Sequence, residues 1–133
     1  MKVLITGCGR HNKGLVQALK NNMDGRKVEV IGINNSPANI LRSDVDEAII
    51  APPVTAPDYI DWLLDLCTKE RVDVILPYIT AELTILAANR DRLESTGTKV
   101  SVASEHTLRA ANNKIEMARM FPEYMPRQAV VRS

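Results

Sequence analysis

The stretch Val3-Leu4-Ile5-Thr6-Gly7-Cys8-Gly9, close to the start of the chain, decides the class of fold. Its aliphatic residues predict a short strand that is buried on both faces, as in a parallel sheet. The glycines permit a tight turn after this strand. Beyond the turn, four apolar residues share one face of a predicted helix: Leu15, Val16, Leu19 and Met23. A strand, a glycine turn and an amphipathic helix are typical of the first unit of a Rossmann-like fold.

Short apolar runs alternate with helical patterns over the first hundred residues. Further strands are predicted over 28–33, 48–50, 72–76 and 100–102. A first helix is predicted over 14–22. A second begins from an N-cap at Thr55 with Pro57 in its first turn, and a third covers 81–93 with Thr80 as its cap. This alternation predicts an α/β fold, a Rossmann-like three-layer sandwich with a doubly wound parallel sheet of about five strands.

The last thirty residues follow a different pattern. Ser104 predicts the cap of a short helix, and Asn113 with Glu116 predicts a capping-box start for another. Residues 128–132 predict a strand. We therefore divide the chain into a Rossmann-like domain over residues 1–103 and a linker over residues 104–133. We expect the linker to lead into a further domain, which makes the chain a piece of a longer protein.

Charge and composition argue against several classes of function. The chain has 17 Lys and Arg against 16 Asp and Glu, so we expect no nucleic-acid partner. The apolar stretches are too short to span a membrane, and a strand begins where a signal sequence would lie, so we expect a cytoplasmic protein. The two cysteines and two histidines lack the spacing of a metal site, and none is predicted.

The glycine turn is a candidate ligand-binding loop because glycines bring backbone N–H groups close to an anion at a helix N-terminus. Its candidate residues are Gly7, Gly9, Arg10 and His11. The loop departs from the dinucleotide-binding motif, since Asn12 holds the third glycine position and Asn34 replaces the acid at the end of the second strand. The loop therefore either binds an anion or only makes the turn. A nucleotide- or dinucleotide-binding regulatory module is the alternative function.

An ordered series of stretches carries a resemblance over almost the whole chain: residues 3–10 (VLITGCGR), 30–34 (VIGIN), 57–64 (PDYIDWLL), 73–77 (DVILP), 82–83 (EL), 88–91 (ANRD) and 104–120. In this order they resemble the N-terminal, pre-ATP-grasp domain of the ATP-grasp ligases. The likeness is greatest to carbamoyl-phosphate synthase large-subunit-like proteins and to the pyrrolysine-biosynthesis ligase group.

This resemblance implies an ATP-dependent carboxylate–amine ligase that works through an acyl phosphate on small-molecule carboxylate and amine substrates. ATP and Mg²⁺ are the cofactors that it implies for the full-length protein. The ATP-grasp domain, which would follow this chain, supplies the nucleotide cleft and the acids that hold the metal. The N-terminal domain is expected to help form the substrate side of the cleft and to be catalytically inert alone.

Two further residues are candidates through the resemblance. Glu82 follows a strand at the carboxyl edge of the sheet, where the resemblance implies an acid that faces the substrate; a helix N-terminus also favours an acid without any ligand. Lys114 stands where some relatives place a lysine near the ATP phosphates, although Asn113 replaces their usual Asp. A solvated lysine is the alternative. A third hypothesis is an interaction domain, such as a homodimer, in which the strand over 128–132 joins a partner's sheet.

Overall fold

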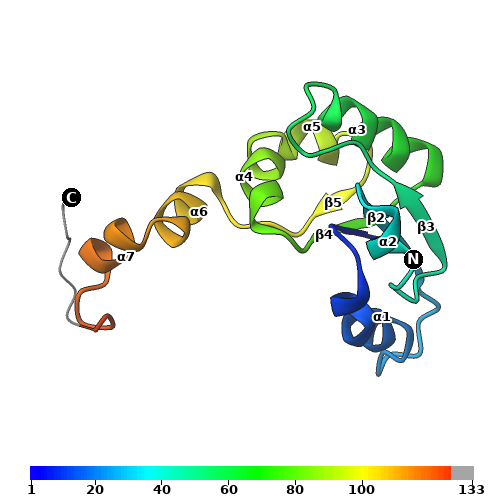
Figure 1. The fold of residues 1–133 in the computed structure, drawn as a ribbon, viewed down its shortest axis with the longest axis horizontal. Helices are drawn as coiled ribbons and strands as arrows, with labels where there is room; N and C mark the ends of the chain where they lie inside the picture. The colour runs from blue at the N-terminus through cyan, green and yellow to red at the C-terminus, as the bar shows by residue number, and fades with distance from the viewer. Residues whose placement is uncertain (127–133) are drawn as a thin grey trace. The chain divides into compact units, whose positions relative to one another are not determined.

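The computed structural model describes residues 1–126 and contains five strands. They are β1 (Lys2–Thr6), β2 (Glu29–Asn34), β3 (Glu47–Ile50), β4 (Val74–Pro77) and β5 (Lys99–Val100). All of their pairings are parallel, and the strand order is β3-β2-β1-β4-β5 (Figure 1). The predicted α/β fold with a doubly wound parallel sheet of about five strands is confirmed.

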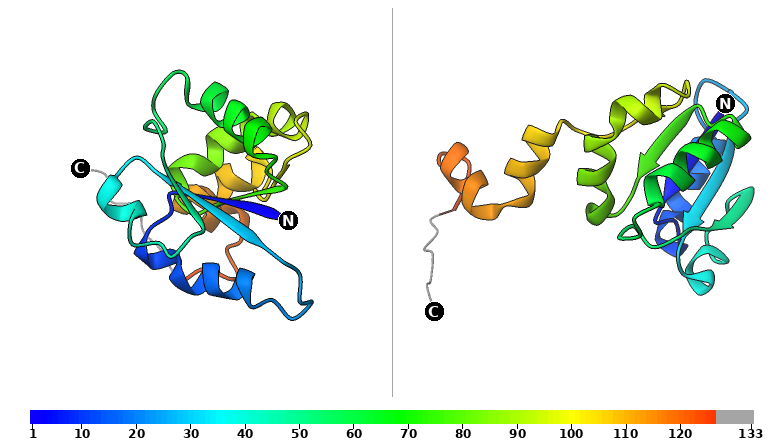
Figure 2. Two further views of the ribbon diagram at one scale, coloured as in Figure 1. Left: turned by 90° about the vertical axis from the view of Figure 1, so that its right-hand side faces the viewer. Right: turned by 90° about the horizontal axis from the view of Figure 1, so that it is seen from above.

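Helices cover both faces of this sheet. They are η1 (Arg10–Asn12), α1 (Lys13–Lys20), α2 (Pro37–Ile40), α3 (Tyr59–Glu70), α4 (Thr80–Ala88) and α5 (Arg90–Glu94). The blue helix α1 lies on one face, and the green helices α3 and α4 lie on the other (Figure 2). The chain therefore changes face between β3 and β4, which makes the β1/β4 junction the switch point of the sheet.

The central strand β1 divides its side chains between two hydrophobic cores. Val3 and Ile5 pack with Val16 of α1 in one core, whereas Leu4 packs with Leu63 of α3 in the other. All five side chains are almost completely buried. This alternation explains why the strand is apolar at every central position, because both of its faces are covered.

Helix α3 begins later than the sequence predicts. The predicted start at Thr55, with Pro57 in the first turn, is wrong, because the chain first makes two separate turns. Their hydrogen bonds run from Ala56 N–H to the Pro53 carbonyl at 2.9 Å and from Tyr59 N–H to the Ala56 carbonyl at 3.1 Å. The helix then starts at Tyr59, whose ring is buried.

The helix predicted over 81–93 is divided into α4 and α5 at Asn89. Its side-chain amide donates a hydrogen bond to the Ile85 carbonyl at 2.9 Å, which ends α4, and the residue is also the N-cap of α5. Asparagine side chains compete in this way with the helical backbone. The prediction for Met23 is also wrong, since α1 ends at Lys20 and the Met23 side chain is fully exposed.

The described chain forms two compact units, one over residues 1–102 and a second that begins at Ala103. The second contains α6 (Glu105–Asn112) and α7 (Lys114–Met120). Both predicted caps are confirmed, because the Ser104 and Asn113 side chains accept hydrogen bonds from backbone N–H groups of the helices that they precede. The strand predicted over 128–132 lies outside the described residues. Within residues 1–126, every helix is too short or too polar to cross a membrane.

Asp46 joins three elements at the amino edge of the sheet. One carboxylate oxygen accepts the Val30 N–H at 2.9 Å, and the other lies 2.6 Å from Lys20 Nζ. Partial burial alone would raise the pKa of Asp46, but these two hydrogen bonds hold it below the usual 3.8. The carboxylate therefore stabilises the fold above pH 3.8, and this contribution is lost as the pH falls through the native pKa.

We expect Asp46→Asn to lower the free energy of unfolding by about 1 kcal/mol at neutral pH, after allowance for the solvent exposure of the ion pair. Urea unfolding over a range of pH measures this difference, which should close as the pH falls below 3.8. The exposed Asp65→Asn is the control. An equal loss of stability in both variants, or a loss that does not depend on pH, would contradict the stabilising role assigned to the Asp46 carboxylate.

Candidate functional site

A cavity of about 250 Å³ opens at the carboxyl edge of the sheet. Its lining residues come from the end of β2, from the segments that follow β1, β2 and β3 (α2 included), and from α3, α4 and the residue before α4. They are Gly7, Ile33, Asn34, Asn35, Asn39, Ala51, Pro52, Val54, Tyr59, Ile79 and Glu82. Ligands of open α/β sheets bind at this edge, near the switch point. The cavity is therefore the candidate functional site.

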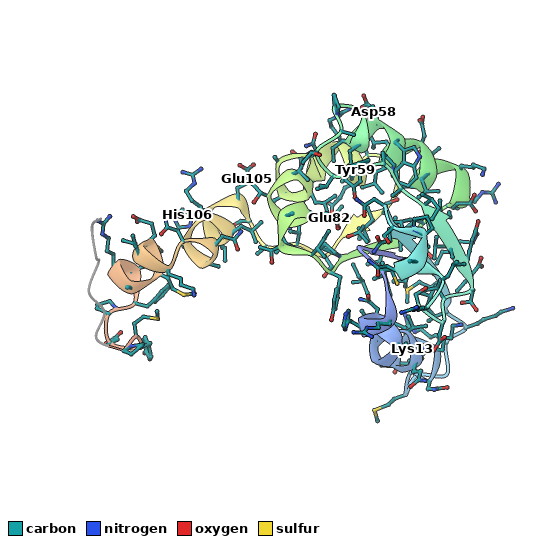
Figure 3. All side chains as sticks on the ribbon, viewed as in Figure 1. Lys13, Asp58, Tyr59, Glu82, Glu105 and His106 are labelled. Carbon is teal, nitrogen blue, oxygen red and sulfur yellow. The ribbon has the colours of Figure 1, made fainter. Side chains whose placement is uncertain are left out.

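Glu82 is the only charged residue in this lining. It lies in the first turn of α4, and only 4% of its surface is exposed. The Thr6 hydroxyl at the end of β1 donates a hydrogen bond to one carboxylate oxygen, and the Tyr59 hydroxyl of α3 donates to the other at 3.2 Å. Figure 3 shows the Tyr59 and Glu82 side chains close together on the same side of the sheet.

Burial controls the electrostatics of this cluster. It raises the pKa of Glu82, and the hydrogen bonds from Thr6 and Tyr59 oppose that rise. Burial also raises the pKa of Tyr59, and the adjacent negative charge of Glu82 raises it further. Tyr59 therefore keeps its proton and remains a donor at neutral pH. A carboxylate accepts about four hydrogen bonds, so these two donors leave part of Glu82 available to a ligand.

Gly7 is required where β1 meets the cavity. Its backbone has a φ of 59°, and a Cβ atom at this position would lie 2.9 Å from Cγ2 of Ile79. Left-handed backbone and close contact with Ile79 both favour glycine here. Gly7 is thus the one residue of the predicted loop that lines the cavity together with Glu82.

The other loop residues predicted to bind a ligand lie outside this lining. The Cys8 N–H donates to the Ile33 carbonyl and the Gly9 N–H donates to the Asn12 side chain, each at 2.8 Å. These bonds occupy N–H groups that an anion would need. Arg10 and His11 are both exposed. The assignment of Gly9, Arg10 and His11 as ligand-binding residues thus stays a prediction.

Asn34 braces the same loop from the end of β2. Its amide nitrogen donates to the Cys8 carbonyl at 2.8 Å, and its amide oxygen accepts the Ser36 N–H at 2.8 Å. Dinucleotide-binding proteins use an acid at this position to hold the ribose. Since both polar groups of Asn34 have partners within the protein, the geometry argues against the dinucleotide-binding alternative.

The residues described here do not fit a Mg²⁺-bound nucleotide. The cavity lining offers one carboxylate and no cation, and residues 1–126 contain no group of three or more His, Cys, Asp or Glu placed to hold a metal. Lys13 of the first helix is paired with Asp44 at 3.0 Å. Lys114 is the exposed first residue of α7, in the second unit, and does not line this cavity.

Comparison with known families settles the relationship. The sequence model of the PylC-like N-terminal domain matches residues 3–101, about three quarters of the chain. The chain belongs to this family. The predicted resemblance to the pyrrolysine-biosynthesis ligase group is confirmed by this match. No curated protein matches the chain significantly.

Solved structures share the fold of this PylC-like domain. The biotin carboxylase domain of a thermophilic 2-oxoglutarate carboxylase, with bicarbonate bound, matches 92% of the chain at 16% identity and a TM-score of 0.64. Pyruvate carboxylase from Rhizobium etli matches 92% at 17% identity and a TM-score of 0.60. N5-carboxyaminoimidazole synthetase from Staphylococcus aureus, complexed with ADP, matches 92% at 16% identity and a TM-score of 0.58. The PylC-like chain spans 27%, 12% and 29% of these three proteins.

Sequence analysis did not identify Thr6 and Tyr59 as site residues. Thr6 has the strand parity of Leu4, so its side chain points to the α3 and α4 face at the carboxyl end of β1. That parity was the available signal. Tyr59 is buried, and its contact with Glu82 joins two helices and has no local signature.

We expect Gly7→Ala to lower the free energy of unfolding by about 2 kcal/mol, because it imposes a left-handed conformation on alanine. Gly14→Ala is the matched control: this position is helical and open, so a gain of about 0.5–1 kcal/mol is expected. Thermal and urea unfolding measure both changes. Equal stability of the two variants would show that Gly7 has no conformational role.

The raised pKa of Glu82 predicts that the wild-type protein loses stability as the pH rises from 4.5, the ordinary value for glutamate, through the higher native pKa. The native state holds the proton more tightly than the unfolded chain, and this advantage disappears when both are ionised. Glu82→Gln should therefore be at least as stable as wild type at neutral pH and should lack this pH dependence. The exposed Glu123→Gln is the control. A Glu82→Gln variant that is destabilised only at neutral pH would contradict the prediction.

Proposed function

We propose that this chain is the N-terminal domain of an ATP-dependent carboxylate–amine ligase and that its cavity forms the substrate side of the reaction cleft. The observation that carries the proposal is the burial of Glu82 at the carboxyl edge of the sheet, where Thr6 and Tyr59 hold its carboxylate. Membership of the PylC-like N-terminal domain family supports the assignment to a ligase.

The proposal assigns ATP and Mg²⁺ to a domain that follows this one. The cavity lacks cations and metal-binding acids, so it does not suit a polyphosphate. The similar carboxylases and synthetase are all more than three times as long as the chain. The carboxylate and amine substrates would then meet between the two domains, and this chain alone would be inert.

The residues of the cavity would bind and orient the substrate. Glu82 offers its free carboxylate positions, while Tyr59 and Thr6 fix the orientation of the group. The apolar side chains of Ile33 and Val54 line the same space and reduce its access to water. An orientation fixed by neighbouring hydrogen bonds is what a binding carboxylate needs. A cytoplasmic location, a possible homodimer and the absence of nucleic-acid partners remain predictions.

A phosphate-release assay tests the proposed function. The 133-residue chain should release no phosphate from ATP when carboxylates and amines are added, whereas the protein extended through the coding sequence after Ser133 should do so. In the extended protein, Glu82→Ala should lower kcat/KM by about 10–100-fold, the value of one charge-assisted hydrogen bond.

Two results would contradict this function. One is ligation by the 133-residue chain alone. The other is a downstream coding sequence that encodes no ATP-binding domain. The exposed Glu123→Gln, placed in the extended protein, controls for general effects of removing a carboxylate.

A further inference from the structure

We infer that the cavity at the carboxyl edge takes a cationic amine, with Glu82 as the counter-ion of its ammonium group. This inference rests on the proposed function and names the substrate part that this domain holds. It predicts that, of the carboxylate and amine substrates, the amine is the one bound here.

The charge of the cavity lining supports this choice. Among its eleven residues, Glu82 is the only one with a carboxyl group, and no Lys, Arg or His is present. An anionic ligand would bring a second negative charge next to a buried carboxylate. Like charges at contact distance in a partly buried site repel each other strongly. The same interaction favours a cation in this position.

The hydrogen-bonding pattern points in the same direction. Thr6 and Tyr59 both donate to Glu82, so the cluster presents acceptor capacity and no free donor toward a ligand. An ammonium group has three N–H donors and no acceptor, which complements this arrangement. The side-chain amides of Asn35 and Asn39, both exposed at the cavity, offer carbonyl acceptors beside their own N–H donors.

The size and the walls of the cavity restrict the ligand further. At about 250 Å³ it is smaller than the roughly 300–1,000 Å³ of pockets that hold drug-sized ligands. It therefore suits one end of a small molecule rather than a whole nucleotide. The side chains of Ile33, Val54 and Ile79 supply apolar walls, against which a short methylene chain packs. An aminoalkyl group combines a small cationic end with such a methylene chain.

Three probes of equal chain length test this inference: cadaverine, glutarate and pentanediol, which carry amine, carboxylate and hydroxyl ends. Each is titrated at neutral pH into the ¹⁵N-labelled 133-residue chain, and amide shifts are followed by NMR. Cadaverine should shift the amides of Gly7, Asn35 and Glu82, whereas glutarate and pentanediol should leave them unchanged. Glu82→Gln should weaken cadaverine binding about 10-fold or more, the value of a charge-assisted hydrogen bond.

Tyr59→Phe is the second variant, because it removes one hydrogen-bond donor from Glu82 and retains the carboxyl group. This variant should bind cadaverine more weakly than wild type but more tightly than Glu82→Gln, since it loses one donor that orients Glu82 and keeps the carboxyl group. The exposed Glu123→Gln should bind as wild type does. Glutarate or pentanediol binding as tight as cadaverine binding, or no shift with cadaverine, would overturn the inference.

The outcome is independent of catalysis because this titration contains no ATP and no second domain. A chain that binds cadaverine while its extended form lacks ligase activity would support the amine site and refute the proposed ligase. An active extended ligase whose N-terminal chain does not bind amines would support the proposed ligase and refute the amine site.

Discussion

The burial of one carboxylate at the switch point of the sheet is the constraint on which this site depends. A carboxylate transferred from water into a protein interior is costly unless donors surround it. Glu82 meets this condition only because β1 ends in a threonine and α3 begins with a tyrosine whose hydroxyl reaches the same group. The cluster thereby joins β1, α3 and α4. Residues of α3 and α4 line the cavity, and Thr6 at the end of β1 supports Glu82 from outside the lining.

The parallel sheet makes this convergence possible. All strands point the same way, so the segments that follow β1, β2 and β3 meet α4 at one edge. The glycine turn forms part of this edge. Gly7 allows the chain to pass close to Ile79, and a hydrogen bond from Asn34 connects the turn to β2. Most of the polar groups near the turn are used within the protein. Glu82 accepts two hydrogen bonds and keeps further acceptor positions in the cavity lining.

The sequence predicts the layers of this domain well, because Val- and Ile-rich runs with helical segments between them reflect burial on both faces of the sheet. It predicts local boundaries less well. The turns before Tyr59 and the side-chain bond of Asn89 depend on short-range geometry that periodicity does not capture. Glu82 was found through its place after a strand and through the family resemblance. Its partner Thr6 lies 76 positions away, and no local pattern encodes that contact.

In the proposed ligase, this domain is the wall that recognises substrate through the buried, ionisable Glu82, and a separate part handles phosphate. The most direct test is the pKa of that carboxyl, measured by ¹³C NMR titration of the 133-residue chain. We predict that Glu82 titrates above 4.5. A pKa at or below 4.5 would mean that hydrogen bonds or solvent outweigh burial at Glu82, and would contradict the dominance of burial described here.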